Sequence, residues 1–199
     1  MKILLVAEGV HELSGALEAL IRRVMGEGAA LEVETADVRD PCVRINTTPG
    51  KGGRLKKRIV RWALEAEKRG FAALVLLVDE DGDRDRRAQV REANEATGMG
   101  AARAAGVAIR TIDAWMLADE GAMSRVLGTA VSAQKSPEEI RDGKGMFEGQ
   151  RACVDTAEPV RDCYRRIAEE VNLERGEGRG PKGLGAFAEG LRLLSKRLL

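Results

Sequence analysis

"FAALVLLVDEDGDRD", residues 71–85, joins the most apolar stretch of the chain to its densest group of acids. Residues 71–78 carry no charge, and a continuous apolar run of this length is typical of a strand that is covered on both faces. Five acids follow within seven positions: Asp79, Glu80, Asp81, Asp83 and Asp85. We therefore predict a central strand of a parallel sheet that ends in a strongly negative loop.

Three other segments have strand patterns, and helical patterns lie between them. The strands are predicted at 2–7, 31–38 and 106–111, and the helices at 13–24, 54–70, 86–104 and 112–128, the last as one helix or two short ones. The alternation of apolar and acidic residues in 31–38 places that strand near a sheet edge. Strands that alternate with helices predict an α/β, Rossmann-like fold with an open, mostly parallel, four-stranded sheet flanked by helices.

Beyond residue 128 only helical patterns follow. In "SPEEI", residues 136–140, Ser136 has the position of an N-cap, with Pro137 at the first helical position and Glu139 completing a capping-box pattern. Further helices are predicted at 155–172 and 185–197, on either side of a glycine-rich loop. We expect an α/β domain over 1–128 and a helical extension over 129–199 that packs on the same domain.

The composition restricts the class of protein. With 199 residues, 44% hydrophobic and 33% charged, the chain belongs to the globular class. No apolar run approaches the roughly 20 residues of a membrane helix, and the short apolar stretch at 2–7 lacks the features of a signal peptide, so we expect a cytoplasmic protein without a membrane partner. The three cysteines form no CxxC pair, which disfavours a disulfide framework or a structural zinc site.

Acids follow two of the predicted strands at the point where each ends. Glu8 comes directly after the first strand, and Asp79 and Asp81 follow the central one. The carboxyl ends of parallel strands meet at one edge of a sheet, where ligands usually bind. Carboxylates that converge there raise one another's pKa, and a hard cation such as Mg²⁺ removes this repulsion. Asp79 and Asp81 point the same way and can share one ion, with Asp83 as a further candidate.

A less specific interpretation stays open beside this one. Acid-rich loops are commonly solvated, and Arg84, Arg86 and Arg87 can neutralise this one through ordinary surface ion pairs of little energetic value.

Three motifs in this order and spacing resemble the Toprim-like proteins, the fold shared by topoisomerases, bacterial primases and overcoming-lysogenization-defect nucleases. They are "VAEGVHE" (6–12), "LLVDEDGD" (76–83) and "IDAWMLAD" (112–119), and the third is similar to a motif of a bacterial Toprim-like family of unknown function. The likeness covers roughly residues 2–128, with a weaker echo at 179–194.

The resemblance implies a magnesium site, which Mn²⁺ can also fill. Glu8 is implied as the general acid or base, and Asp79 and Asp81 as metal ligands. Asp113 stands where the family pattern has a glutamate, and is a further candidate ligand. Independently of the family, Mg²⁺ held by carboxylates can orient a phosphate and stabilise charge on its oxygens. Phosphodiester cleavage is consistent with these groups.

Two basic segments are candidates for phosphate binding. Six basic residues lie within residues 51–61, and Lys51 and Arg54 are nearest to the predicted helix start. Lys182, in a second glycine-rich segment at 178–185, is the other candidate. A solvated helix face and a plain linker are the respective alternatives. Aromatic residues are too few for a base-stacking platform.

Three functions remain as hypotheses from the sequence. The first is a magnesium-dependent nuclease or related phosphoryl-transfer enzyme that acts on DNA or RNA. The second is a noncatalytic Toprim-like module that binds nucleic acid or works with an ATPase partner. The third, a receiver-type phosphoacceptor, fits less well, because receivers place paired acids after the first strand and this chain places one. Formation of a homo-oligomer is left open.

Overall fold

The computed structural model describes residues 1–9, 13, 15–26, 30–41, 43, 53–80, 82–96, 98–154, 158–173 and 182–198. Within these residues the chain forms one four-stranded sheet. The strands are β1 (Lys2–Ala7), β2 (Glu32–Asp37), β3 (Ala73–Asp79) and β4 (Ala102–Ala108), in the spatial order β2-β1-β3-β4. All neighbouring strands are parallel, so the predicted open α/β sheet is confirmed.

The two interior strands are β1 and β3, and almost all of their residues are buried on both faces of the sheet. This is the environment expected for the uncharged run at 71–78. Strand β2 lies at the edge of the sheet, as its alternating sequence predicted. Ala7 is paired with Leu77, so the residues that follow β1 and end β3 lie at the same edge of the sheet.

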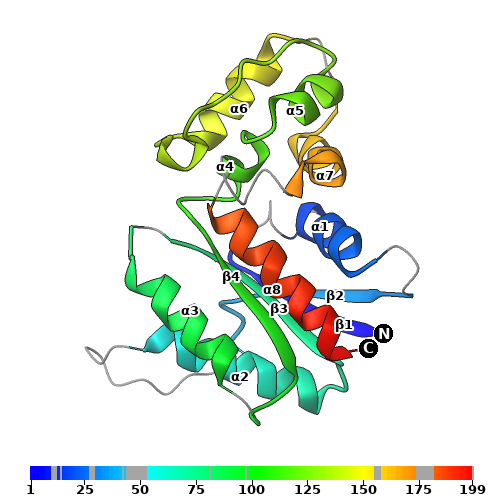
Figure 1. Ribbon diagram of the computed structural model, residues 1–199, viewed down its shortest axis with the longest axis vertical. Helices are drawn as coiled ribbons and strands as arrows, with labels where there is room; N and C mark the ends of the chain where they lie inside the picture. The colour runs from blue at the N-terminus through cyan, green and yellow to red at the C-terminus, as the bar shows by residue number, and fades with distance from the viewer. Residues whose placement is uncertain are drawn as a thin grey trace.

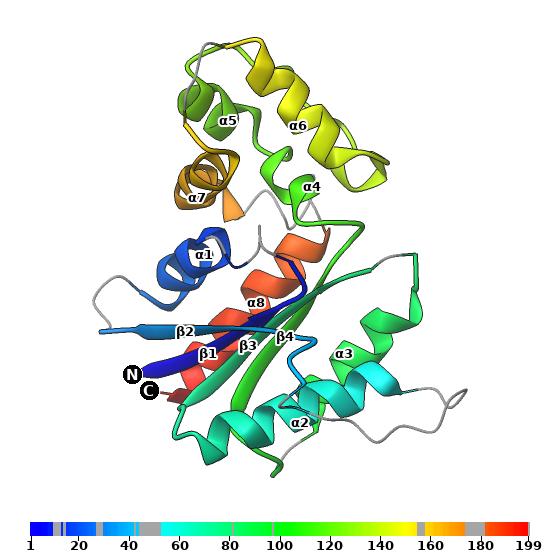
Figure 2. The same cartoon turned by 180° about the vertical axis from the view of Figure 1, so that it is seen from behind.

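Helices cover both faces of the sheet (Figures 1 and 2). The helices α2 (Arg54–Lys68) and α3 (Asp85–Glu95) pack on the face that carries Leu74, Leu76 and Val78. The helices α1 (Ala16–Met25) and α8 (Lys182–Leu198) cover the opposite face, which carries Val75 and Leu77. None of the helices within the described residues is long and apolar enough to cross a membrane.

A second group of helices follows β4. It comprises α4 (Asp113–Met116), α5 (Glu120–Leu127), the 3-10 turn η2 (Pro137–Glu139), α6 (Gly143–Ala152) and α7 (Val160–Glu170). The figures show α4 to α7 together at one end of the molecule, while α8 returns along the sheet. The rings of Trp115 and Phe187 have centroids 5.6 Å apart, so α4 and α8 share one hydrophobic core.

The approach of α8 to β4 depends on a residue without a side chain. A Cβ atom at Gly106 would lie 2.6 Å from Cδ2 of Phe187, closer than two carbon atoms can pack. Glycine at this position therefore allows the ring of Phe187 to sit directly on the strand.

The predicted helix at 86–104 is wrong in its second half. Helix α3 ends at Glu95, and β4 begins at Ala102 rather than at residue 106. Alanine-rich sequence favours helix, but pairing with β3 decides the structure of this segment. Arg103 is buried on β4, and its guanidinium donates hydrogen bonds to the carbonyl oxygens of Ala93 at 2.7 Å and Met99 at 2.6 Å. These bonds satisfy carbonyl groups near the end of α3.

The predicted capping box at Ser136 does not form. The Ser136 side chain makes no capping hydrogen bond, and η2 is a single 3-10 turn rather than the start of a long helix. Helix α6 begins at Gly143 instead, after Asp142, whose Oδ1 accepts from the backbone N–H of Gly145 at 2.7 Å. Helix α7 begins at Val160, later than the predicted residue 155.

Candidate functional site

Glu8 and Asp79 lie together at the carboxyl edge of the sheet. Glu8 follows β1 and Asp79 ends the neighbouring strand β3. Oε2 of Glu8 accepts a hydrogen bond from the backbone N–H of Asp79 at 3.1 Å. The Glu8 side chain is 24% exposed, so its carboxylate remains within reach of solvent. The structure thus brings together two of the residues that the sequence placed in one site.

A guanidinium group lies against both of these residues. Arg86 is in the first turn of α3, and its Nη1 lies 3.3 Å from Oε2 of Glu8. The same nitrogen donates to the backbone carbonyl oxygen of Asp79. Gly82 adopts a φ of 75°, as the predicted turn between β3 and α3 requires. The turn directs α3 back over the strand end, which carries the arginine to Glu8.

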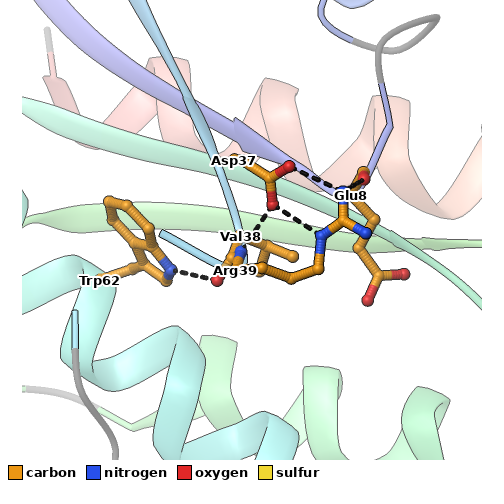
Figure 3. Close-up of polar contacts among 5 residues, drawn as sticks. All are labelled: Glu8, Asp37, Val38, Arg39 and Trp62. Atoms are coloured by element: carbon orange, nitrogen blue, oxygen red, sulfur yellow. Dashed lines mark hydrogen bonds and ion pairs between the residues drawn. The ribbon is translucent and has the colours of Figure 1, made fainter. Parts of the chain in front are cut away.

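A second arginine holds the main chain of Glu8 (Figure 3). Arg39 follows β2, and its Nη2 donates to the backbone carbonyl oxygen of Glu8 at 2.9 Å and to Oδ2 of Asp37 at 2.8 Å. The hydrogen bonds from Arg39 hold the pKa of Asp37 below its usual value, and the side-chain bond to Asp37 raises the pKa of Arg39. Val38 accepts from Nε1 of Trp62 at 3.3 Å, which ties this end of β2 to α2.

Two further acids of the loop, Asp83 and Glu80, have partners of their own. Asp83 is exposed, and its Oδ1 accepts from the backbone N–H of Asp85 at 3.0 Å, at the start of α3. Glu80 is buried and its Oε1 accepts from Nε of Arg87 at 2.6 Å. Asp81 lies outside the described residues. Among those that are described, no three His, Cys, Asp or Glu side chains gather closely enough to hold a metal ion.

Asp113 takes part in a contact between helices. It is the first residue of α4, it is 8% exposed, and its Oδ1 accepts a hydrogen bond from the hydroxyl group of Tyr164 on α7. The Tyr164 ring in turn packs edge-on against Phe147 of α6, with centroids 4.6 Å apart. This arrangement gives Asp113 a role in joining three helices.

The first basic candidate segment lies at the start of α2. Arg54 is the first residue of that helix and is exposed, whereas Lys51 lies outside the described residues. The backbone N–H of Leu55 donates to Oε1 of Gln89 at 2.9 Å, and Lys56 pairs with Glu92 at 2.9 Å. A side chain of α3 therefore accepts a hydrogen bond from one of the backbone N–H groups at the start of α2. Arg54, beside this group, is exposed to solvent.

The second basic candidate lies at a helix terminus that already holds an anion. The backbone N–H groups of Lys182 and Gly183 donate to the two carboxylate oxygens of Glu138, at 3.0 and 2.8 Å. Burial raises the pKa of Glu138, although the two hydrogen bonds oppose this shift. The anion at the start of α8 is thus an internal carboxylate, and the Lys182 side chain is exposed.

Sequence reasoning missed the groups that organise this edge of the sheet. Arg86 and Arg87 were expected only as neutralising surface charges, and each does pair with an acid, Glu8 and Glu80 respectively. No sequence signal marked Arg39 or Glu138, because each contacts a segment distant along the chain.

A polar cavity of about 570 Å³ lies elsewhere, where α1, α5 and α8 meet the end of α7. Its lining includes Arg23, Arg125, Arg192, Asp119 and Glu170. Internal contacts engage these charges: Nε of Arg125 donates to Glu170 at 2.5 Å, and Asp119 caps α5 by accepting from the backbone of Gly121 and Ala122. The described lining of the cavity contains none of the candidate site residues named above.

Comparisons of the chain with protein-family models, curated proteins and solved structures give no match. The function must therefore be argued from the geometry of the site itself.

Proposed function

We propose that this protein is a magnesium-dependent nuclease, or a related phosphoryl-transfer enzyme, that acts on nucleic acid at the carboxyl edge of its sheet. The observation that carries the proposal is the hydrogen bond of 3.1 Å between Oε2 of Glu8 and the backbone N–H of Asp79. It joins acidic residues from the ends of two adjacent parallel strands, which is where open α/β sheets bind their ligands.

The proposed ligands are of the chemical kind that Mg²⁺ prefers, and the described residues alone bring no three such side chains together. The acids at this edge offer carboxylate oxygens, the ligands that this hard cation prefers, and the ion retains several waters when few carboxylates bind it. In the proposal Asp79 and Asp81 hold the ion. Asp83 and Asp113 are not metal ligands in the proposal. They keep their contacts with the start of α3 and with Tyr164, respectively.

When bound, Mg²⁺ would stabilise charge on the phosphate oxygens and lower the pKa of a water molecule. The chain's own groups supply the rest. In the proposal the half-buried Glu8 carboxylate takes or returns a proton, and Arg39 fixes its main chain. The exposed Arg54 adds positive charge that nucleic acid requires, since the net charge of +1 gives no general attraction to phosphates.

The first test is cleavage of supercoiled plasmid and of short DNA and RNA in the presence of Mg²⁺ or Mn²⁺. Metal-dependent nicking that disappears in Glu8→Gln and Asp79→Asn is the expected result. Glu32→Gln is the matched control, because Glu32 is an exposed carboxylate on β2 that pairs with Lys2. Nicking by the two site variants at the wild-type rate would contradict the proposal.

One observation favours a second candidate, a noncatalytic Toprim-like module that binds nucleic acid or works with an ATPase partner. The carboxylate expected to move a proton is paired with Arg86. The guanidinium lies against the carboxylate oxygen Oε2, which would have to exchange a proton with the substrate. Metal and nucleic-acid binding without cleavage in the same experiment would support this candidate over the enzyme.

A further inference from the structure

We propose that the polar cavity where α1, α5 and α8 meet the end of α7 binds a small phosphorylated compound whose organic part is polar, such as a sugar phosphate. The proposal needs no metal and does not depend on the edge with Glu8, because the described lining of the cavity contains no residue of that edge. The volume of about 570 Å³ lies within the range of small-molecule sites in proteins.

Three helices each contribute a guanidinium group to the cavity. Arg23 lies in the last turn of α1, Arg125 in the last turn of α5, and Arg192 on α8. Every basic residue of the described lining is an arginine. The planar guanidinium fork matches the oxygen atoms of a phosphate, whereas a lysine offers a single point of charge. A phosphate monoester presents three acceptor oxygens, enough for one contact with each arginine.

Arg23 is fixed in the wall of the cavity by the end of α7. Its Nη1 donates to the carbonyl oxygens of Ala168 at 2.7 Å and Val171 at 2.9 Å. Both acceptors are neutral carbonyl groups, so these two bonds orient the guanidinium without cancelling its charge. An anion that enters the cavity therefore meets a positive group that is already positioned.

Arg125 and Arg192 form ion pairs that solvent weakens. Arg125 pairs with Glu170, and the two side chains are 60% and 36% exposed. Arg192 pairs at 3.3 Å with Glu189, three residues earlier on α8, and these side chains are 33% and 54% exposed. Exposed pairs of this kind contribute little to stability. A phosphate can therefore replace the glutamates as the partner of these arginines at small cost.

A buried carboxylate joins two walls of the cavity. Asp119 is 6% exposed, and its Oδ1 accepts from the backbone N–H groups of Gly121 and Ala122 at the start of α5. Its Oδ2 accepts from the backbone N–H of Asn172, which follows α7. A Cβ atom at Gly121 would lie 3.2 Å from Oδ1 of Asp119 and 3.4 Å from Nη1 of Arg125, so glycine leaves room for both charged groups.

The rest of the lining favours a polar organic part. Its uncharged residues are Gly121, Asn172 and Leu173, and the described lining includes no aromatic side chain. The amide of Asn172 and the carboxylate of Glu170 can donate to and accept from hydroxyl groups. A nucleobase would find no aromatic ring to stack on in this part of the chain. A sugar phosphate therefore fits the cavity better than a nucleotide does.

The test is isothermal titration calorimetry of the whole protein with ribose 5-phosphate, at low salt and without divalent metal. We expect saturable binding at one site, and no measurable binding of unphosphorylated ribose. Arg125→Gln and Arg192→Gln should each weaken the binding about tenfold, the scale of one charge-assisted hydrogen bond. Glu170→Gln should instead strengthen it about threefold, because this variant removes the internal partner that competes for Arg125.

Arg161→Gln is the matched control. Arg161 is an exposed arginine on α7 that pairs with Asp162, and it is not among the lining residues. Its affinity for ribose 5-phosphate should stay within about twofold of the wild type, as expected of a surface charge outside the cavity. Urea unfolding checks that each variant is folded. If the variants of Arg125 and Arg192 do not fold, the gain in Glu170→Gln decides the question.

The outcomes separate this inference from the proposed function. Saturable binding that depends on both arginines supports the cavity as a ligand site, whether or not the protein cleaves nucleic acid. Absence of saturable binding, or binding that is unchanged in Arg125→Gln and Arg192→Gln, would refute it. Equal affinity for inorganic phosphate, or tighter binding of AMP, would refute a sugar phosphate as the class of ligand.

Discussion

The carboxylate of Glu8 accepts a hydrogen bond from the backbone N–H of Asp79, although the two residues are 71 positions apart. The parallel pairing of β1 with β3 produces this contact, because it aligns the ends of the two strands. The bond ties one acidic side chain to the main chain of another acidic residue. The contribution of this bond to stability and the proposed activity of the Glu8 carboxylate can therefore be tested separately.

Glu8→Gln should remove activity while leaving the fold nearly intact. The glutamine oxygen can still accept from Asp79, and the lost ion pair with Arg86 is worth about 1 kcal/mol or less. Loss of the proton-transfer group should lower the nicking rate about a hundredfold or more. Plasmid nicking and urea unfolding of the same preparation measure both effects. A variant that is unfolded, or one that is fully active, would be inconsistent with this role.

Tyr164→Phe should lower stability without changing metal affinity. The hydroxyl group of Tyr164 donates to the buried carboxylate of Asp113, and its removal leaves that carboxylate short of a donor. We expect the free energy of unfolding to fall by about 1–3 kcal/mol. Urea unfolding measures this loss, and Mn²⁺ titration checks the site. A marked change in Mn²⁺ affinity would instead place Asp113 in the metal site.

Glu138 should make the protein less stable as the pH rises through its pKa. Burial raises the pKa of this carboxyl in the folded protein, so the folded state binds its proton more tightly than the unfolded state does. Its contribution to the free energy of unfolding is therefore greatest at a pH below the pKa of Glu138 in the unfolded state. It falls as the pH rises through the pKa of Glu138 in the folded state. In urea unfolding from pH 4 to 7, the stability of the wild type relative to Glu138→Gln should decline.

The neighbouring Glu139→Gln is the control for this pH dependence. Glu139 is exposed on the same 3-10 turn, and the two backbone N–H groups at the start of α8 bond to Glu138. If the stability of the wild type relative to Glu139→Gln declined equally as the pH rises, the effect would not come from Glu138.

Asp37 should have the opposite dependence on pH. The hydrogen bonds from Arg39 lower its pKa, so the unfolded state binds the proton more tightly. Its stabilising contribution is present above the unfolded value near 3.8 and is lost as the pH falls through the lower folded value. Asp37→Asn should therefore be less stable than the wild type at pH 7, and the difference should shrink as the pH falls below 3.8. The difference should be small, because the pair is largely exposed to solvent, and a difference that grows as the pH falls would argue against the ion pair.

Gly106→Ala should destabilise the contact between α8 and β4. The added methyl group would meet the ring of Phe187 at 2.6 Å, and overpacking of this kind costs about 1–3 kcal/mol. Gly149→Ala in α6 is the control, since a Cβ atom there meets nothing within 4 Å and alanine favours the helix. Thermal unfolding measures both variants. Equal melting temperatures would mean that α8 packs less closely than described.

The sequence alone was enough to predict the sheet and one side of the site. The uncharged run that becomes β3 is typical of a strand covered on both faces, and the helical patterns on either side of it favour a parallel sheet. The positions of Glu8 and Asp79 at one edge follow from the same argument, because all parallel strands end on the same side. The start of β4 was missed, since its alanines favour helix locally and only pairing with β3 makes them a strand.

Only the tertiary structure decided which groups contact Glu8 and the start of α8. Arg39 and Arg86 reach Glu8 across 31 and 78 positions of the chain, and Glu138 reaches the start of α8 across 44. Local sequence patterns depend on the period of a helix or strand. They carry no information on contacts between residues so far apart along the chain. The partner of a long charged side chain depends on strand order, helix placement and side-chain rotamer together, and these exist only once the chain has folded.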